Sequence, residues 1–540
     1  MSSLSLPEHT TDGRARAAAL DDRHRPDVEP TSMVSYLSHG RVLVIGDEEA
    51  ALDAARHLDN ELVPTLVVPS ADAPSSGTLD GLTVVRGPDP QLEGSLGNFT
   101  IRFADADEES AAPKLVTQAR FDLVLDVGKK PLLAREVLPP GYYATRREAQ
   151  ALEAALAELP DMRGEFEKPK YFNYDPNICA HGRRGVKGCT RCLDVCPASA
   201  ITSIGERISV DPNLCQGFGS CATVCPTGAI TYAFPSNGDL LGYLRQTLVR
   251  YRDGDGSDPV LMFYDSASPG VASLAESLPE NVLPLQLEEI GSLGMDAWLC
   301  CLAWGVRRIL VLAGPDTPQS VRDVVAQEAA LAGTLLDAMG YADAAVRLCD
   351  SSDVDSVAAQ QDDWLQLERP AKFAPPPEKR VLFRLAMEHL LENAPQRRKS
   401  VALRAGAPFG QVKVDGAACT LCMSCVAVCP TSALREGQGL PQLKFVEDAC
   451  VQCGMCVKAC PEDAVTRETR YLFDTEERCA TRLLHEEQPA CCISCGKPFA
   501  TRSMLDVMAK KLADHWMFQG EAEKRRLEMC EDCRVRDMMR

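Results

Sequence analysis

The sequence predicts a multidomain protein of mixed α/β and α+β class, and three observations support this prediction. Two segments, 39–160 and 238–369, alternate apolar strand-like runs with helical stretches. Two others, 168–236 and 405–472, contain closely spaced cysteines, and the last segment, 476–540, contains two C-x2-C pairs. A chain of 540 residues is long enough for three or four domains, each with its own core.

The composition favours metal ligation in a reducing compartment. Most of the 24 cysteines lie in C-x-x-C groups, whereas disulfide frameworks are typical of short secreted chains. Residues 1–38 contain no apolar signal core and are predicted to form a disordered leader. No apolar run is long enough to span a membrane, so we expect a cytoplasmic protein.

The net charge of the chain indicates which class of macromolecule it binds. A net charge of −20 argues against a nucleic-acid surface. An acidic surface suits the docking of redox proteins with basic faces, although it serves solubility equally well. Redox proteins are therefore the expected partners.

The N-terminal α/β domain (39–160) begins with a buried strand at Arg41, a turn at Gly46 and an alanine-rich helix. This order is Rossmann-like, but the dinucleotide fingerprint is missing. Asp47, Glu48 and Glu49 stand where further glycines would approach a pyrophosphate, and carboxylates repel phosphate. A scaffold or docking role is favoured over nucleotide binding.

The segment 405–472, here termed the second cysteine unit, contains the run C-x2-C-x2-C-x3-C-P twice. Bacterial ferredoxins hold two [4Fe-4S] clusters with this run, and the fourth cysteine of each run binds the other cluster. The unit therefore resembles a two-cluster ferredoxin domain; the alternative is a zinc or disulfide framework. The resemblance implies two ligand sets, Cys419, Cys422, Cys425 and Cys460 for one cluster and Cys450, Cys453, Cys456 and Cys429 for the other.

The segment 168–236, the first cysteine unit, repeats this pattern with an insertion. The phrase that ends at Cys179 matches the phrase that ends at Cys215, which indicates that Cys179 is a first ligand and that 180–188 replaces the usual two residues. An unrelated free cysteine is the alternative, and His181 is expected to be a solvated loop residue. The ligand sets are then Cys179, Cys189, Cys192 and Cys225 for one cluster and Cys196, Cys215 and Cys221 for the other.

Phe218 occupies the position of a second cysteine in the first cysteine unit. A cubane that lacks one corner ligand can lose that iron, so a [3Fe-4S] centre is one interpretation. A [4Fe-4S] cluster with a non-protein ligand and a degraded site are the others. Loss of a thiolate and added burial both change the reduction potential.

The central α/β domain (238–369) alternates strands and helices, which predicts a doubly wound parallel sheet. Its phrase EEIGSLGMDAWLCCLAWGVRRILVL is similar to the delta subunit of hydrogenase–heterodisulfide reductase systems, which implies an electron-transfer adaptor. Cys300, Cys301 and Cys349 are expected to be buried structural thiols. A proline-rich linker and a helix fill 370–400.

The tail (476–540) carries a second metal signature. Two C-x2-C knuckles about thirty-four residues apart predict a closed, zinc-ribbon-like Zn²⁺ site, with a third iron–sulfur site as the alternative because Cys479 and Cys491 lie nearby. A helix is expected over 502–518. The predicted metal ligands are Cys492, Cys495, Cys530 and Cys533.

These patterns favour a protein that relays single electrons through up to four clusters, three of them [4Fe-4S]. The domain layout resembles large bacterial iron–sulfur proteins associated with formate-dehydrogenase-type enzymes, which implies such an enzyme as partner. Since no catalytic residue is recognisable, an electron carrier is favoured over an enzyme. The alternatives are an oxidoreductase subunit with a flavin or nucleotide in an α/β domain and an assembly or docking factor for a redox enzyme.

Overall fold

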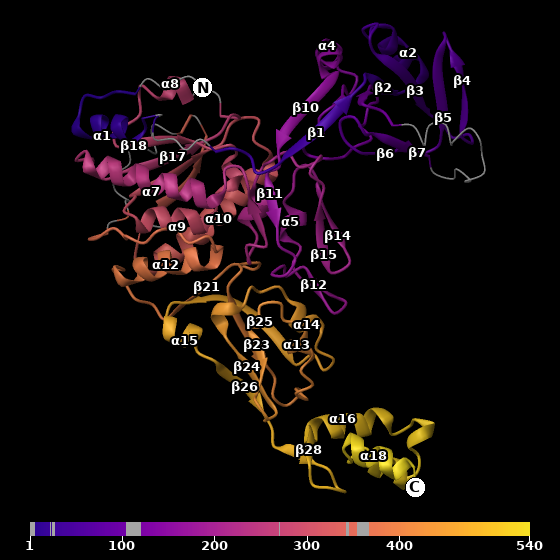
Figure 1. Cartoon of the computed structure of the whole chain (residues 1–540), viewed down its shortest axis with the longest axis vertical. Coiled ribbons are helices and arrows are strands. Elements are labelled where there is room, and N and C mark those ends of the chain that lie inside the picture. Colours follow the sequence, from indigo (N-terminus) through magenta and orange to yellow (C-terminus); the bar gives the residue numbers. More distant parts are fainter. Residues whose placement is uncertain are drawn as a thin grey trace.

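The computed structural model describes residues 6–21, 23, 28–103, 120–268, 271–341, 345–350, 352–353, 365 and 367–539. Figure 1 shows the N-terminal α/β domain and the tail at opposite ends of the longest axis, with the two cysteine units between them. The central α/β domain lies beside the first cysteine unit. Among the described residues, no helix is both long and apolar enough to cross a membrane.

The N-terminal α/β domain is built on a six-stranded sheet of order β4-β5-β3-β2-β8-β9, parallel except for β4. The strands are β2 (Arg41–Ile45), β3 (Val63–Pro69), β4 (Ser75–Leu79), β5 (Leu82–Gly87), β8 (Leu123–Asp126) and β9 (Tyr142–Ala144). Helices α2 (Glu48–Arg56) and α4 (Ala149–Glu158) cover one face. A hairpin of β6 (Gln91–Glu93) and β7 (Thr100–Arg102) covers the other.

The acidic residues after Gly46 begin helix α2. Asp47 is the N-cap, and its carboxylate accepts a hydrogen bond of 3.1 Å from the Ala50 N–H. Glu48 and Glu49 lie in the first turn, where negative charge interacts favourably with the helix dipole. The side chains that replace the dinucleotide fingerprint therefore stabilise the helix end.

The central α/β domain has a four-stranded parallel sheet of order β18-β17-β19-β20. The strands are β17 (Val260–Tyr264), β18 (Val282–Gln286), β19 (Arg308–Leu312) and β20 (Val346–Cys349). Alternate residues of each strand point to opposite faces of the sheet. One face packs against α7 (Asn237–Asp253), α9 (Met295–Ala303) and α10 (Gln319–Ala338), and the other face packs against α8 (Val271–Leu274). Cys300, Cys301 and Cys349 are buried, as predicted. Part of the predicted range, including 354–364, lies outside the described residues.

The prediction of a disordered leader over 1–38 is wrong for most of the residues described there. Helix α1 (Thr11–Ala19) packs on α7, and its fully buried Arg16 donates hydrogen bonds of 3.0 and 3.1 Å to the carbonyls of Pro279 and Val282. Strand β1 (Met33–Ser38) pairs antiparallel with β10 (Gly164–Pro169). The segment is ordered by contacts with residues far away in the sequence, which composition does not reveal.

Both cysteine units contain two antiparallel strand pairs and two short helices. In the first unit β11 (Phe172–Tyr174) pairs with β16 (Ile230–Tyr232) and β14 (Ile201–Ile204) with β15 (Arg207–Val210), beside α5 (Arg191–Asp194) and α6 (Ser220–Thr223). In the second, β22 (Gly410–Val414) pairs with β25 (Val465–Leu472) and β23 (Leu434–Glu436) with β24 (Gln442–Phe445), beside α13 (Ser424–Ala427) and α14 (Met455–Lys458). The apolar residue after each C-P step begins or lies next to the start of a strand, as predicted.

Helix α12 (Lys379–Glu392) leads into the second cysteine unit, where β21 (Ser400–Ala402) and β26 (Arg482–Glu486) extend the strand pairs, and α15 (Thr475–Cys479) follows β25. The tail contains β27 (Pro489–Cys491), β28 (Pro498–Thr501), α16 (Arg502–Leu512), α17 (Glu521–Arg526) and α18 (Glu531–Met538). The helix expected over 502–518 ends at Leu512, and a 3-10 turn follows at Trp516–Phe518.

Candidate iron–sulfur and metal sites

Two cavities in the second cysteine unit are each lined by one crossed set of cysteines. One is bounded by Cys450, Cys453 and Cys456 of the second run and by Cys429 of the first. The other is bounded by Cys419, Cys422, Cys425 and Cys460. The fold thus places the fourth cysteine of each run beside the other run's first three.

The first cysteine unit has a comparable cavity, lined by Cys196, Cys215 and Cys221. The two units also share polar contacts to sulfur. The Ala200 N–H donates to Cys196 Sγ at 3.3 Å, and the Ala464 N–H donates to Cys460 Sγ at the same distance. Sulfur atoms in both units therefore have equivalent backbone donors.

Phe218 lines the cavity of the three-cysteine set, in a loop that keeps the backbone shape of a cluster-binding loop. Its neighbours Gly217 and Gly219 have φ values of +87° and +75°. Leu421 and Met423, which flank Cys422, have φ values of +53° and +58°. The loop therefore still turns its backbone around the cavity, while Phe218 itself packs against the core of the central α/β domain.

The remaining set, Cys179, Cys189, Cys192 and Cys225, also converges. Cys179, Cys189 and Cys225 all act electrostatically on Cys192, and burial followed by these neighbours raises the pKa of Cys192 to about 12. The fold thus brings Cys179 to the other three across the insertion 180–188.

The cysteine pockets suit a cationic group. Burial, followed by the charges of neighbouring cysteines, raises the pKa of Cys425 and Cys456 to about 12, so bare thiols there stay neutral at physiological pH. Four thiolates can share such a pocket only with compensating positive charge, which the irons of a cluster supply as protons are released. All cysteines of both units are free, which argues against the disulfide alternative.

The insertion 180–188 forms a hairpin of β12 (Gly182–Arg183) and β13 (Val186–Lys187). His181 beside it is buried, contrary to the expectation of a solvated residue. Its Nδ1 lies 2.8 Å from the Cys189 carbonyl and its Nε2 2.8 Å from Ser203 Oγ. Both ring nitrogens therefore have polar partners in the chain, and the residue ties the insertion to the first unit.

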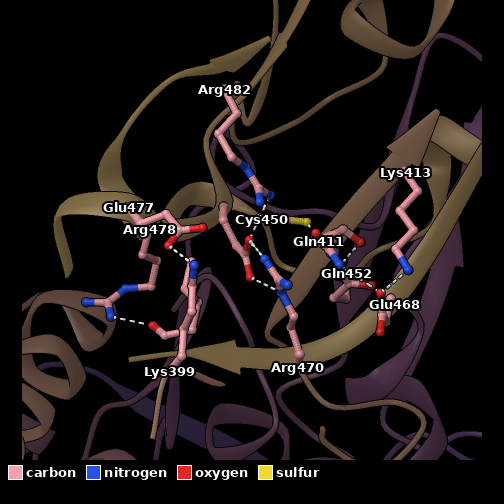
Figure 2. A network of polar contacts seen from close by, with 12 residues as sticks. Lys399, Gln411, Lys413, Cys450, Gln452, Glu468, Arg470, Glu477, Arg478 and Arg482 are labelled. Carbon is pink, nitrogen blue, oxygen red and sulfur yellow. Dashed lines mark hydrogen bonds and ion pairs between the residues drawn. The ribbon is translucent and has the colours of Figure 1, made fainter. Parts of the chain in front are cut away.

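A buried acidic residue anchors the loop that leads to Cys450. Glu447, with 3% of its side chain exposed, accepts two hydrogen bonds from Arg470, of 2.8 and 2.7 Å, and one of 2.8 Å from Arg482. Figure 2 shows these arginines beside Cys450 and Gln452. This network was not predicted, because its members are dispersed in the sequence and charged.

Gln452 is the polar neighbour that distinguishes the Cys450 site from the Cys419 site. Its Nε2 donates to Cys450 Sγ at 3.5 Å and to the Gln411 carbonyl at 3.3 Å (Figure 2). The corresponding residue of the other run is Leu421, whose side chain has no donor. Hydrogen bonds to ligand sulfur raise the reduction potential of a cluster.

We expect the substitution Gln452→Leu to lower the potential of the cluster at Cys450. A lost stabilisation of about 1 kcal/mol in the reduced state corresponds to about 40 mV for one electron. Leu is compatible with the backbone because Leu421 adopts the same left-handed conformation, with φ +53° against +55° at Gln452. An EPR-monitored redox titration measures the shift, and Gln411→Leu, which keeps the carbonyl acceptor, is the control; equal shifts in both would contradict the prediction.

The tail brings its four predicted metal ligands together. The sulfur atoms of Cys492, Cys495, Cys530 and Cys533 all lie within 4.8 Å of one another. Burial raises the pKa of Cys492, but N–H donors of Cys530, Cys495 and Ser494 outweigh it and bring the pKa to about 6. The set offers four sulfur donors, the ligand type of closed tetrahedral Zn²⁺ sites.

Comparisons with known proteins place both cysteine units in one class. Residues 186–229 and 418–465 match two different family models, both described as 4Fe-4S dicluster domain. Cys179 lies outside the first match. Over 102 residues the chain is 32% identical to "Hydrogenase-4 component A" of Escherichia coli (strain K12), an alignment that covers 18% of this chain and 47% of that protein. The chain thus spans about half the length of this curated relative.

The family matches and the cysteine-lined cavities agree on the same two segments of the chain. The segment 418–465 contains all eight cysteines of the two-cluster pattern, and the segment 186–229 contains six of them. The chain therefore contains two ferredoxin-type 4Fe-4S dicluster domains. Iron–sulfur clusters in domains of this type carry out electron transfer.

Proposed function

We propose that the protein relays single electrons along one line of four clusters. In this proposal the order of sites is Cys196/Cys215/Cys221, then Cys179/Cys189/Cys192/Cys225, then Cys429/Cys450/Cys453/Cys456, then Cys419/Cys422/Cys425/Cys460. The observation that carries it is the contact between the two cysteine units, in which residues beside the two middle sites form hydrogen bonds across the junction.

The insertion hairpin makes this contact. Arg183 Nη1 donates to the carbonyl of Cys429 at 3.0 Å, and Lys458 Nζ donates to the carbonyl of Lys187 at 2.9 Å. Cys453 also acts electrostatically on Cys189, so the two middle sites influence each other. The insertion in the first run thus supplies the residues that hold the second unit in place.

Helix α12 also connects the two cysteine units. Arg380 donates hydrogen bonds to the carbonyl of Pro226, at 3.5 Å, and to the carbonyl of Asp448. Pro226 follows Cys225, and Asp448 stands two residues before Cys450. A single side chain therefore joins the loops of the two middle sites.

The ends of the line have distinct proposed roles. The site beside Phe218 holds a cluster whose nuclearity, three or four irons, is set by the missing thiolate. The tail holds Zn²⁺ and packs next to the last site, where Thr501 Oγ1 donates to the Thr420 carbonyl at 2.9 Å. The electron donor or acceptor is a hydrogenase- or formate-dehydrogenase-type enzyme in the cytoplasm; the likeness to a hydrogenase component favours the first.

We expect the double variant Arg183→Glu/Lys458→Glu to slow electron transfer between the units. Each substitution removes a charge-assisted hydrogen bond, worth about 1 kcal/mol at an exposed position, and places a carboxylate against a carbonyl. Pulse radiolysis of the oxidised protein measures the rate at which an added electron redistributes among the clusters.

The control is Arg184→Glu/Lys187→Glu, which makes the same charge change on exposed side chains of the same hairpin. It should redistribute electrons at the wild-type rate, and iron content should be unchanged in both variants. An unaltered rate in Arg183→Glu/Lys458→Glu would show that these contacts do not carry the relay.

A further inference from the structure

A cavity larger than any of the three cluster cavities lies where four parts of the chain meet. Its walls come from the loops and short helices of the first cysteine unit, from α9 and α10 of the central α/β domain, from α12, and from residues 404–409 that precede β22. Figure 1 shows α12 between the central domain and the second unit. Neither the family matches nor the relay assigns a role to this space.

One wall of this junction cavity is a cluster loop. Cys225, a ligand in the proposed relay, and its neighbours Val224 and Pro226 all line the space. Cys225 is buried, with 8% of its surface exposed. A small molecule in the cavity would therefore contact the loop to which the proposed relay assigns one of the middle clusters.

The charge of the lining favours an anion. Four cationic side chains face three carboxylates, although the whole chain carries a net charge of −20. The cations are Arg191, Lys379, Arg380 and Arg404, and the carboxylates are Asp194, Asp296 and Glu328. Burial also raises the pKa of Glu328, which moves that carboxyl towards its neutral form.

Two of the arginines are free to bind an anion. Arg191 Nη2 donates to the Gly406 carbonyl at 2.7 Å, and Arg404 Nη1 donates to Gln327 Oε1 at 3.0 Å, so both have neutral partners. Neither takes part in an ion pair within the part of the chain that the structure describes, whereas Lys379 lies 3.6 Å from Asp296. Arginine binds phosphate and carboxylate groups through its planar fork of donors.

Much of the remaining lining is apolar. The rings of Phe383 and Phe409 stack on each other with centroids 4.6 Å apart, and Met295, Pro226 and Pro408 also line the space. An apolar pocket with a few convergent polar groups is the usual form of a small-molecule site. The expected ligand has a planar ring system and an anionic group.

The neighbouring cluster narrows the chemical class of the expected ligand, because an iron–sulfur cluster exchanges one electron at a time. Nicotinamide nucleotides transfer hydride, whereas flavins also take part in one-electron chemistry and carry phosphate. We propose that the junction cavity binds a flavin nucleotide, with the phosphate at Arg191 and Arg404 and the ring system against the apolar wall near Cys225. This site goes beyond the relay, which needs no small molecule there.

The test is a titration of the anaerobically purified full-length protein, with its clusters, with FMN and with FAD. Quenching of flavin fluorescence reports binding without any electron transfer, so the result is independent of the relay. Arg404→Glu should weaken binding by about tenfold or more, because it removes a charge-assisted contact to phosphate and adds repulsion. Glu328→Gln should bind at least as tightly as the wild type.

Arg398→Glu makes the same charge change on an exposed residue outside the cavity and should leave affinity unchanged. Weaker flavin binding by Arg404→Glu, together with undiminished binding by Glu328→Gln, would exclude a general folding defect as the cause. Absence of binding of both flavins to the wild type, or equal affinity of wild type and Arg404→Glu, would overturn the proposal. If ADP bound to the wild type as tightly as FAD, the cavity would recognise the phosphate groups without the flavin ring, and the proposal of a flavin ligand would be overturned.

Discussion

Replacing Cys530 with serine is expected to unfold the tail while both cysteine units keep their clusters. The apolar cluster of the tail has four buried members, Cys492, Met529, Cys530 and Cys533, of which three are predicted metal ligands. Without metal, little apolar surface remains to hold β27, β28 and α18 together. Binding of structural Zn²⁺ contributes about 10–16 kcal/mol in comparable small sites, so its loss outweighs the other contacts.

Zinc analysis and amide hydrogen exchange of the tail measure this effect. We expect the wild type to hold one zinc per chain and Cys530→Ser to hold none, with loss of protection throughout the tail. Cys491→Ser is the matched control, since Cys491 is exposed and outside the four-sulfur group. Iron in place of zinc, or an equal effect of Cys491→Ser, would support the third iron–sulfur site instead.

The substitution Glu447→Gln is expected to destabilise the second cysteine unit by about 3–5 kcal/mol, because Arg470 and Arg482 lose the buried carboxylate that pairs with both of them. Glu447 joins β25 to β26 through Arg470 and Arg482 and lies three residues before Cys450. The variant should therefore release clusters from this unit at a lower temperature. Thermal loss of the visible absorbance of the clusters measures it.

Glu468→Gln provides the comparison within the same network (Figure 2). Glu468 forms an ion pair of 2.6 Å with Lys413, but 46% of its side chain is exposed. Exposed pairs contribute about 0–1 kcal/mol, so this variant should resemble the wild type. If both variants melted alike, burial of Glu447 would not be the source of the stability.

Much of the cluster chemistry could be predicted because its determinants are local. Cysteines two or three residues apart are delivered to one cavity by a single loop, as at Cys419, Cys422 and Cys425. The apolar residue after each C-P step begins or closely precedes a strand for the same reason, since neighbouring residues share one local conformation. Fold class and the two dicluster domains follow from such short-range patterns.

Contacts between distant residues could not be predicted in this way. Lys458 reaches Lys187 across 271 sequence positions, and Arg16 reaches Val282 across 266. Both are ordinary charged residues whose partners are backbone carbonyls, and a carbonyl carries no sequence signal. The ordered N-terminal helix and the docking of the two units therefore appeared only in the folded chain.

The site beside Phe218 illustrates what can be learned from the sequence and what requires the folded structure. The spacing of the neighbouring cysteines along the chain is enough to show that a thiolate is absent there. The left-handed conformation of Gly217 and Gly219 and the cavity that they border depend on the folded chain. The sequence likewise determined which residues can ligate, whereas packing between the units decided which clusters are neighbours, because distances between loops depend on the whole fold.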